Sequence, residues 1–242
     1  TPATNTTNIA GNVLYAHGNA SASNDIIAHN FTASGHYNLA TTTNTASGSI
    51  FQSNTRLLHT MGGSLFLGKN AGNLAVSVGT NTGIGEDALN DFNGDVGHNT
   101  AIGYQSADSI TTISSYNTAV GSLTMGTAAA GADGNTVVGY SAGRNIARGG
   151  YNTLVGYKAG QEFSQTNYNI GIGYQPFTGS IGTDDISDCI AIGKNAGYFN
   201  TTSSKMFLGN YYNGAPDGGH SSSLIMGEMD LQGDTSGSGR VT

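Results

Sequence analysis

Residues 99–103 read Asn-Thr-Ala-Ile-Gly (NTAIG), and near copies stand at residues 117–121 (NTAVG), 135–139 (NTVVG) and 152–156 (NTLVG). Ten glycines close such a motif, and the steps between them are 17, 18, 18, 18, 17, 17, 20, 16 and 18 residues. Self-similarity at a fixed period is the signature of a repeat architecture. The closing glycines are Gly68, Gly85, Gly103, Gly121, Gly139, Gly156, Gly173, Gly193, Gly209 and Gly227.

The residue before each glycine is apolar and mostly β-branched, which is typical of a buried strand position. We expect these side chains to form a ladder, either in the core or at a contact between chains. The expected ladder residues are Ile84, Ile102, Val120, Val138, Val155, Ile172, Ile192 and Leu208.

The slot two residues earlier shares a face with this ladder, because strand side chains alternate. It holds threonine in five consecutive copies, from Thr82 to Thr153. The threonine hydroxyls are expected to form hydrogen bonds in the interior. The slot between the two is apolar or small and points the other way. A strand that is apolar on both faces is covered on both sides. One chain rarely covers both faces of a short strand, so an oligomer is expected.

A period of 17–18 residues is too short for two helices, but it fits one coil of a parallel β-solenoid with two short strands and two turns. The small residues and glycine after the motif suit a corner with positive φ. At the opposite corner the asparagines tolerate left-handed backbone, and each amide can bond the same amide one coil away. Ten coils would form a rod of about 50 Å.

The solenoid is expected over residues 61–232. Residues 1–60 carry the motif only loosely and are assigned to an N-terminal cap or stalk-like β segment. Residues 233–242 are expected to be a flexible tail. The longest step contains the insertion SIGTDDISD at residues 180–188, where Asp184 and Asp185 are candidate ligand contacts on a protruding loop.

Composition excludes several classes of protein. The net charge of −7 and the pI near 5.1 argue against a nucleic-acid partner. No apolar run approaches the roughly 20 residues of a membrane helix, so no membrane partner is expected. The single cysteine, Cys189, excludes internal disulfides. Only 10% of residues are charged, against about 25% in an average soluble domain.

Few residues point to chemistry. A row of tyrosines after the motif glycine could form a carbohydrate platform or a purely structural stack. The six histidines show no metal-ligand spacing, and no nucleophile–base set or paired acids mark a cleft. We therefore expect no catalytic residue, no metal and no cofactor, and predict that the chain is not an enzyme. The candidate row is Tyr104, Tyr140, Tyr157 and Tyr174.

The run NTAIGYQSA…NTAVGS…NTVVGYSAG…NTLVGYKAG resembles the Asn-Thr-Ala-(Ile/Val)-Gly-Tyr repeats of phage tail fibres. It is also similar to the shorter repeats in the heads of trimeric autotransporter adhesins. The resemblance covers roughly residues 61–229. It implies a homotrimeric, left-handed parallel β-roll whose motif strands face the trimer interior. The period of 17–18 residues departs from the shorter adhesin period.

The expected function is that of a structural and adhesive trimeric fibre segment, located outside the cell or on a virion. Its partners would be two further copies of the chain and, through the resemblance, glycans on a host or prey surface. One alternative is a polysaccharide-degrading tailspike, which would need carboxylates at equal positions in adjacent coils. The other is an ice-binding β-solenoid, suggested by the evenly spaced threonines.

Overall fold

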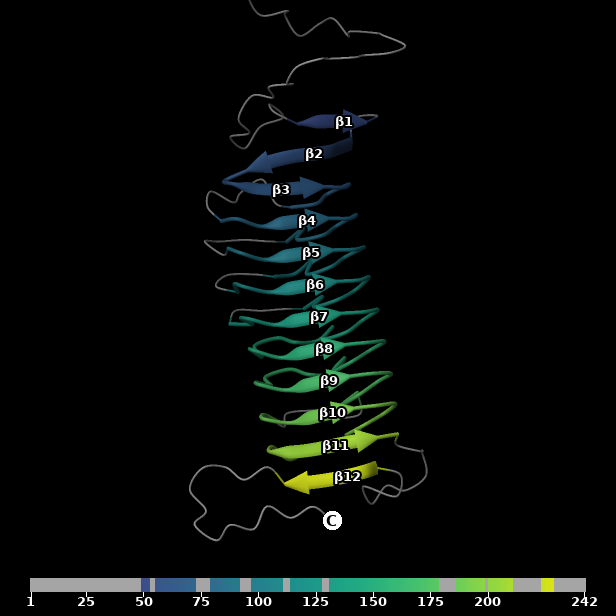
Figure 1. The fold of residues 1–242 in the computed structure, drawn as a ribbon. Coiled ribbons are helices and arrows are strands. Elements are labelled where there is room, and N and C mark those ends of the chain that lie inside the picture. Colours follow the sequence, from purple (N-terminus) through teal and green to yellow (C-terminus); the bar gives the residue numbers. More distant parts are fainter. Residues whose placement is uncertain are drawn as a thin grey trace, which may run out of the picture. The chain divides into compact units, whose positions relative to one another are not determined.

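A computed structural model describes residues 49–52, 55–72, 79–91, 97–110, 114–127, 131–178, 186–198 and 200–210, together with the backbone of 223–228. All regular elements in these ranges are strands, and they form one sheet in chain order (Figure 1). No helix in the described ranges is long and apolar enough to cross a membrane. The strands are β1 (Ile50–Gln52), β2 (Thr55–Met61), β3 (Ser64–Leu67), β4 (Thr82–Ile84), β5 (Thr100–Ile102), β6 (Thr118–Val120), β7 (Thr136–Val138), β8 (Thr153–Val155), β9 (Ile170–Ile172), β10 (Ile190–Ile192), β11 (Lys205–Gly209) and β12 (Ser223–Glu228).

Strands β3 to β11 run parallel, one per coil, and this confirms the predicted all-β parallel solenoid (Figure 1). Equal motif positions face each other, as in the pairing of Thr100 with Thr118 and of Ile102 with Val120. The regular part, β4 to β10, makes about seven turns. The tenth motif does not extend the parallel stack, because β12 pairs antiparallel with β11. At the other end β1, β2 and β3 form an antiparallel meander, so the expected boundary at residue 60 falls inside β2.

Each described coil carries one strand of this sheet and not the two that the period suggested. On the side opposite the strand, successive turns are joined by a few backbone hydrogen bonds that do not belong to a strand pair. The amide of Ala107 donates to the carbonyl of Thr124 at 2.8 Å, and the amide of Gly143 to that of Ala159 at 2.8 Å. These bonds satisfy the backbone without strand geometry, because the turns hold many residues at positive φ.

The motif glycine is required by backbone shape and by space. Gly121 has φ of 131°, a value that side chains with a Cβ rarely adopt. A Cβ placed there would collide with the carbonyl oxygen of Gly139 in the next coil. The same collision recurs from coil to coil, which explains why the glycine closes every motif of the parallel stack.

The asparagines that precede strands β4 to β9 form a buried amide ladder, as predicted. Asn135 accepts from the backbone amide of Asn152 at 3.0 Å and from its Nδ2 at 3.0 Å. Its own Nδ2 donates to Oδ1 of Asn117 at 3.1 Å and crosses the coil to the carbonyl of Gly149 at 2.8 Å. Each asparagine therefore ties neighbouring coils together and also braces its own coil.

The left-handed backbone at this corner belongs to the residue before the asparagine, which corrects the expectation. His98, Tyr116 and Tyr151 have φ between 58° and 63°. The asparagine side chain is needed inside the coil for hydrogen bonds, so the strained turn falls one position earlier, where the side chain points outward.

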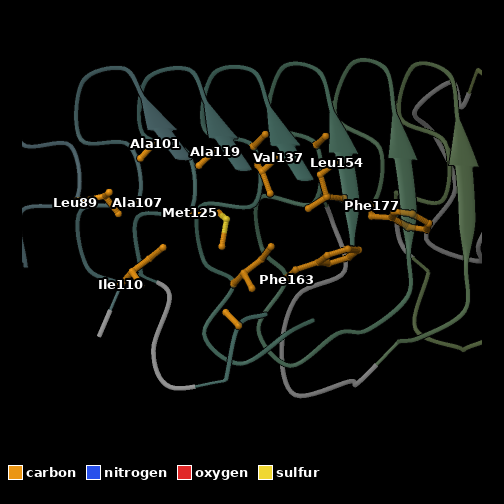
Figure 2. Packing of buried hydrophobic residues seen from close by; sticks show 14 of the residues in the cluster. Leu89, Ala101, Ala107, Ile110, Ala119, Met125, Val137, Leu154, Phe163 and Phe177 are labelled. Carbon is orange, nitrogen blue, oxygen red and sulfur yellow. The ribbon is translucent and has the colours of Figure 1, made fainter. Parts of the chain in front are cut away.

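Two slots that share one space contribute to the core of each coil: the middle of the strand and the position six residues later, with further side chains such as Ile110 and Phe163 beside them (Figure 2). In six coils a larger side chain in one slot is matched by a small one in the other, whereas the coils of Ala101 and Ala191 have small residues in both slots. A Cβ on Gly160 would lie 2.8 Å from Leu154, and one on Gly83 would lie 3.4 Å from Leu89. The large member thus changes place along the chain. The pairs are Phe66 with Gly72, Gly83 with Leu89, Ala119 with Met125, Val137 with Gly143, Leu154 with Gly160, and Gly171 with Phe177.

Candidate binding surface

The outward face of the sheet is the first candidate surface. In each short strand the middle residue is buried and the two flanking side chains point out, as in the exposure pattern of β5 and β9. The predicted aliphatic ladder lies on this outward face, with Ile102 37% exposed and Ile192 40% exposed. Of the two places that the sequence left open for the ladder, the core of the chain is therefore wrong, because other buried side chains fill the coil. All eight ladder residues are half-buried or exposed: Ile84, Ile102, Val120, Val138, Val155, Ile172, Ile192 and Leu208.

The threonine ladder shares this outward face, which corrects the expectation that its hydroxyls bond inside. Thr100, Thr118 and Thr153 are half-buried, and Thr136 is exposed. The face changes along the stack. At the C-terminal end the threonine slot holds Ile170, Ile190 and Met206, and at the N-terminal end it holds Leu65. The outward face is thus threonine-rich in the middle and aliphatic at both ends.

A row of rings, here called the downstream ladder, follows the motif glycine and is exposed, as the sequence suggested. Tyr140 stacks on Tyr157 with ring centroids 5.5 Å apart, and Tyr157 stacks on Tyr174 at 5.1 Å. The ring planes of these pairs lie within 15° of each other. The Nζ of Lys158 lies 5.5 Å from the Tyr157 ring centroid, within cation–π distance. The row therefore forms a stack, one of the two roles that the sequence left open.

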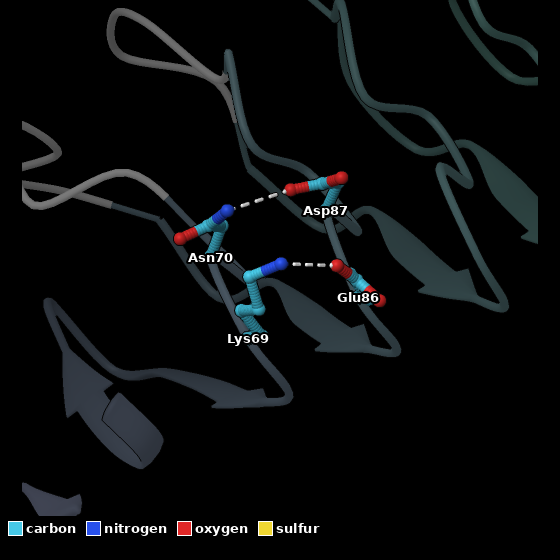
Figure 3. A network of polar contacts seen from close by, with 4 residues as sticks. All are labelled: Lys69, Asn70, Glu86 and Asp87. Atoms are coloured by element: carbon cyan, nitrogen blue, oxygen red, sulfur yellow. Dashed lines mark hydrogen bonds and ion pairs between the residues drawn. The ribbon is translucent and has the colours of Figure 1, made fainter. Parts of the chain in front are cut away.

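The downstream ladder is interrupted at Ser122, between Tyr104 and Tyr140. Before Tyr104 the row continues with a charged pair in place of rings. The Nζ of Lys69 donates to Oε1 of Glu86 at 2.6 Å, and Nδ2 of Asn70 donates to Oδ1 of Asp87 at 3.0 Å (Figure 3). The hydrogen bond and the charge of Glu86 raise the pKa of Lys69. The pair is exposed, so it adds little to stability.

A second row of rings, here called the upstream ladder, was missed by the sequence reading. His98 stacks on Tyr116 with centroids 5.0 Å apart, and Tyr151 stacks on Tyr168 at 5.3 Å. Gly134 separates the two pairs, and a Cβ there would lie 2.8 Å from the Tyr151 ring. The available signal was the residue before each motif asparagine, in HNT, YNT, GNT, YNT and YNI.

The candidate acids do not form a site in the described part of the chain. Asp184 and Asp185 lie outside the described residues. Within the described ranges no group of three or more His, Cys, Asp or Glu side chains could hold a metal ion. Cys189 takes the place of an asparagine: its amide donates to Oδ1 of Asn169 at 3.0 Å, and burial raises the pKa of its thiol.

Comparisons with protein-family models, with curated proteins and with solved structures find no match for this chain.

Proposed function

We propose that this chain is a structural and adhesive segment of a homotrimeric fibre, exposed outside a cell or on a virion, that attaches to a host, prey or other surface through glycans. The observation that carries the proposal is the outward aliphatic ladder. It is a regular apolar row on the outward face of the sheet, and no described part of the chain covers it.

Other copies of the same chain are the occupant that fits this face best. Apolar side chains that repeat at every coil match an identical row at the same spacing. Burial of apolar area is stabilised by about 25 cal/mol per Å². Three copies around one axis can each hide this face from water, which agrees with the trimer implied by the sequence resemblance. Apolar residues scattered singly over a surface are normal, but a continuous regular row of them marks an interaction site.

The two aromatic ladders support the adhesive part of the proposal. They flank the strand face, and their tyrosines are about half exposed and carry hydroxyl groups at the tip. Aromatic rings and hydroxyls together suit neutral sugars, which present both C–H groups and hydroxyls. The low share of charged residues also favours an uncharged ligand.

The oligomeric part is tested by light scattering on the purified chain. We expect a molar mass three times the 24.6 kDa of one chain. A stable monomer at micromolar concentration would overturn the proposal.

The adhesive part is tested separately on a glycan array. Binding to a defined group of neutral glycans is expected, and a blank array with an intact trimer would reduce the segment to a spacer.

A second candidate function is ice binding, and the outward threonine ladder is the observation that favours it. Hydroxyls and methyl groups repeat at one coil spacing on an accessible sheet face. In this case the face stays free and the chain is a monomer. Thermal hysteresis that is lost in Thr118→Lys would support this function, and a trimer without hysteresis would exclude it.

A further inference from the structure

We propose that the interruption of the downstream ladder at Ser122 is a binding slot for one hexopyranose ring of gluco configuration, held between Tyr104 and Tyr140. This inference rests on the proposed attachment through glycans and names the site and the sugar class.

The width of the slot follows from the ladder itself. Consecutive rings lie 5.1 Å and 5.5 Å apart at their centroids. Each pair is one coil apart, a step of about 4.8 Å. Tyr104 and Tyr140 are two coils apart, so the space between their rings is about 10 Å. One ring, and no more, fits there at stacking distance from both.

The floor of the slot is the continuous backbone of the coils. The amide of Leu123 donates to the carbonyl of Tyr104 at 2.9 Å, and the amide of Ser141 donates to that of Ser122 at 2.9 Å. The row therefore lacks a ring at Ser122, while the backbone beneath it is unbroken. Ser122 is half-buried and places a short polar side chain at the bottom.

The proposed walls of the slot are two exposed tyrosines that have no ring next to them in the row on the side of Ser122. One side of Tyr140 is covered by Tyr157. Among the described residues Tyr104 stacks on no ring, because Glu86 precedes it in the row. Both tyrosines are nearly half exposed, at 47% and 46%. A flat ligand between the two tyrosines would bury both of its faces against aromatic rings, and neither face would stay in water.

A ligand enclosed on both sides must present C–H groups on both of its faces. In a gluco-configured pyranose the hydroxyls at C2, C3 and C4 are equatorial, so both faces carry axial C–H groups. An axial hydroxyl, as at C4 of galactose, would point at one of the rings and lose its hydrogen bonds.

The walls and floor are also uncharged, which favours a neutral sugar over an acidic one. Across the three coils the row and the position after it carry only neutral side chains: Tyr104, Gln105, Ser122, Leu123, Tyr140 and Ser141.

The test uses the intact chain and methyl β-D-glucopyranoside as the probe, observed by saturation-transfer NMR. Methyl β-D-galactopyranoside is the comparison sugar. A single ring binds weakly, with a Kd on the order of 1 mM. We expect the glucoside to bind at least tenfold more tightly than the galactoside.

The deciding variant is Ser122→Tyr, which fills the slot with the ladder's own ring and preserves the stacking pattern. It should weaken glucoside binding at least tenfold without a change in molar mass. The matched control, Lys194→Tyr, adds the same ring to the same row beyond Tyr174 and should leave binding unchanged. If Ser122→Tyr fails to fold, Tyr140→Ala replaces it and should weaken binding to the same extent.

The possible failures are distinguishable. Glucoside binding that survives Ser122→Tyr or Tyr140→Ala overturns the slot but leaves attachment through another surface. Equal binding of the galactoside overturns the sugar class. No binding of either sugar overturns the slot, and a blank glycan array would also remove the proposed attachment.

Discussion

At the scale of single residues, the site of the motif glycine has no room for a side chain. Gly121 combines φ of 131° with a neighbour's carbonyl oxygen at the place where a Cβ would lie. Gly121→Ala must therefore push two coils apart, and we expect a loss of at least about 3 kcal/mol in the free energy of unfolding. Chemical denaturation measures it. Gly131→Ala is the control, because φ is also positive there but no atom lies within 4 Å.

The amide ladder is the second feature at this scale. Asn135→Ala removes both donors to Asn117 and Gly149 and the acceptor for Asn152, all in buried surroundings. A buried group left without its partner costs about 1–3 kcal/mol, so we expect a loss of about 3 kcal/mol in unfolding free energy. Asn145→Ala breaks one half-buried bond to Glu162 and should cost less than 1 kcal/mol. Equal losses in the two variants would contradict the ladder's importance.

His59 in β2 makes stability depend on pH. Its ring is buried and stacks on Phe66 with centroids 4.9 Å apart, and neither ring nitrogen has a hydrogen-bond partner within the described residues. Burial, helped by the charge of Arg56, lowers the pKa of His59 to about 4. Below its ordinary pKa near 6.5 the unfolded chain takes up a proton that the folded chain does not bind.

The unfolding free energy should therefore fall as pH decreases from 6.5 to 4, by at most about 1.4 kcal/mol per pH unit, and the contribution should level off below pH 4. Denaturation curves of the wild type and of His59→Phe, recorded across this range, measure the difference. A constant difference between the two proteins would show that His59 titrates normally.

At the scale of the coil, the residue in the middle of the strand and the residue six positions later share the same part of the core. Ala119→Leu overfills the coil of Met125, while Met125→Gly empties it, and each change alone should cost about 1–4 kcal/mol. Together they reproduce the arrangement of Leu154 with Gly160. We expect the double variant to be about 1–3 kcal/mol more stable than the sum of the single effects.

A double-mutant cycle by chemical denaturation measures this coupling. Ala119→Leu combined with Tyr174→Ala is the control pair and should be additive, because the two sites share no coil. Additivity in the Ala119–Met125 pair would mean that the two slots are independent.

At the scale of the whole molecule, the composition of the outward face should decide how firmly copies hold together. The face is aliphatic at its ends and threonine-rich in the middle. The double variant Ile170→Thr with Ile190→Thr gives the C-terminal coils the threonines found in the middle of the face, and it retains β-branched side chains. Because these side chains point outward, the coil itself should be little affected, while the proposed assembly loses buried apolar groups worth about 0.8 kcal/mol per CH₂.

We expect the double variant to dissociate at a concentration at least tenfold higher than the wild type, as measured by analytical ultracentrifugation on dilution. The converse variant, Thr100→Ile with Thr118→Ile, should dissociate at a lower concentration. Unchanged dissociation in both directions would show that this face is not the contact between copies.

The local sequence determined the parallel stack, the place of the motif strand in each coil, and the aliphatic and threonine ladders, because each coil repeats one backbone conformation and equal side chains must then lie over one another. It also determined the stacked tyrosines at 140, 157 and 174. The asparagine ladder followed for the same reason, since a buried amide pairs best with an identical amide one coil away.

Only the tertiary structure decided which face of the strand points inward. A three-residue strand with apolar groups on both faces has no polar side to mark the solvent, so Ile102 and Ala101 looked equally suited to the core. Closure of the coil settles this in favour of Ala101, which is fully buried, whereas Ile102 stays 37% exposed. The upstream ladder of rings and the gap at Ser122 likewise become surfaces only when consecutive coils bring them into line.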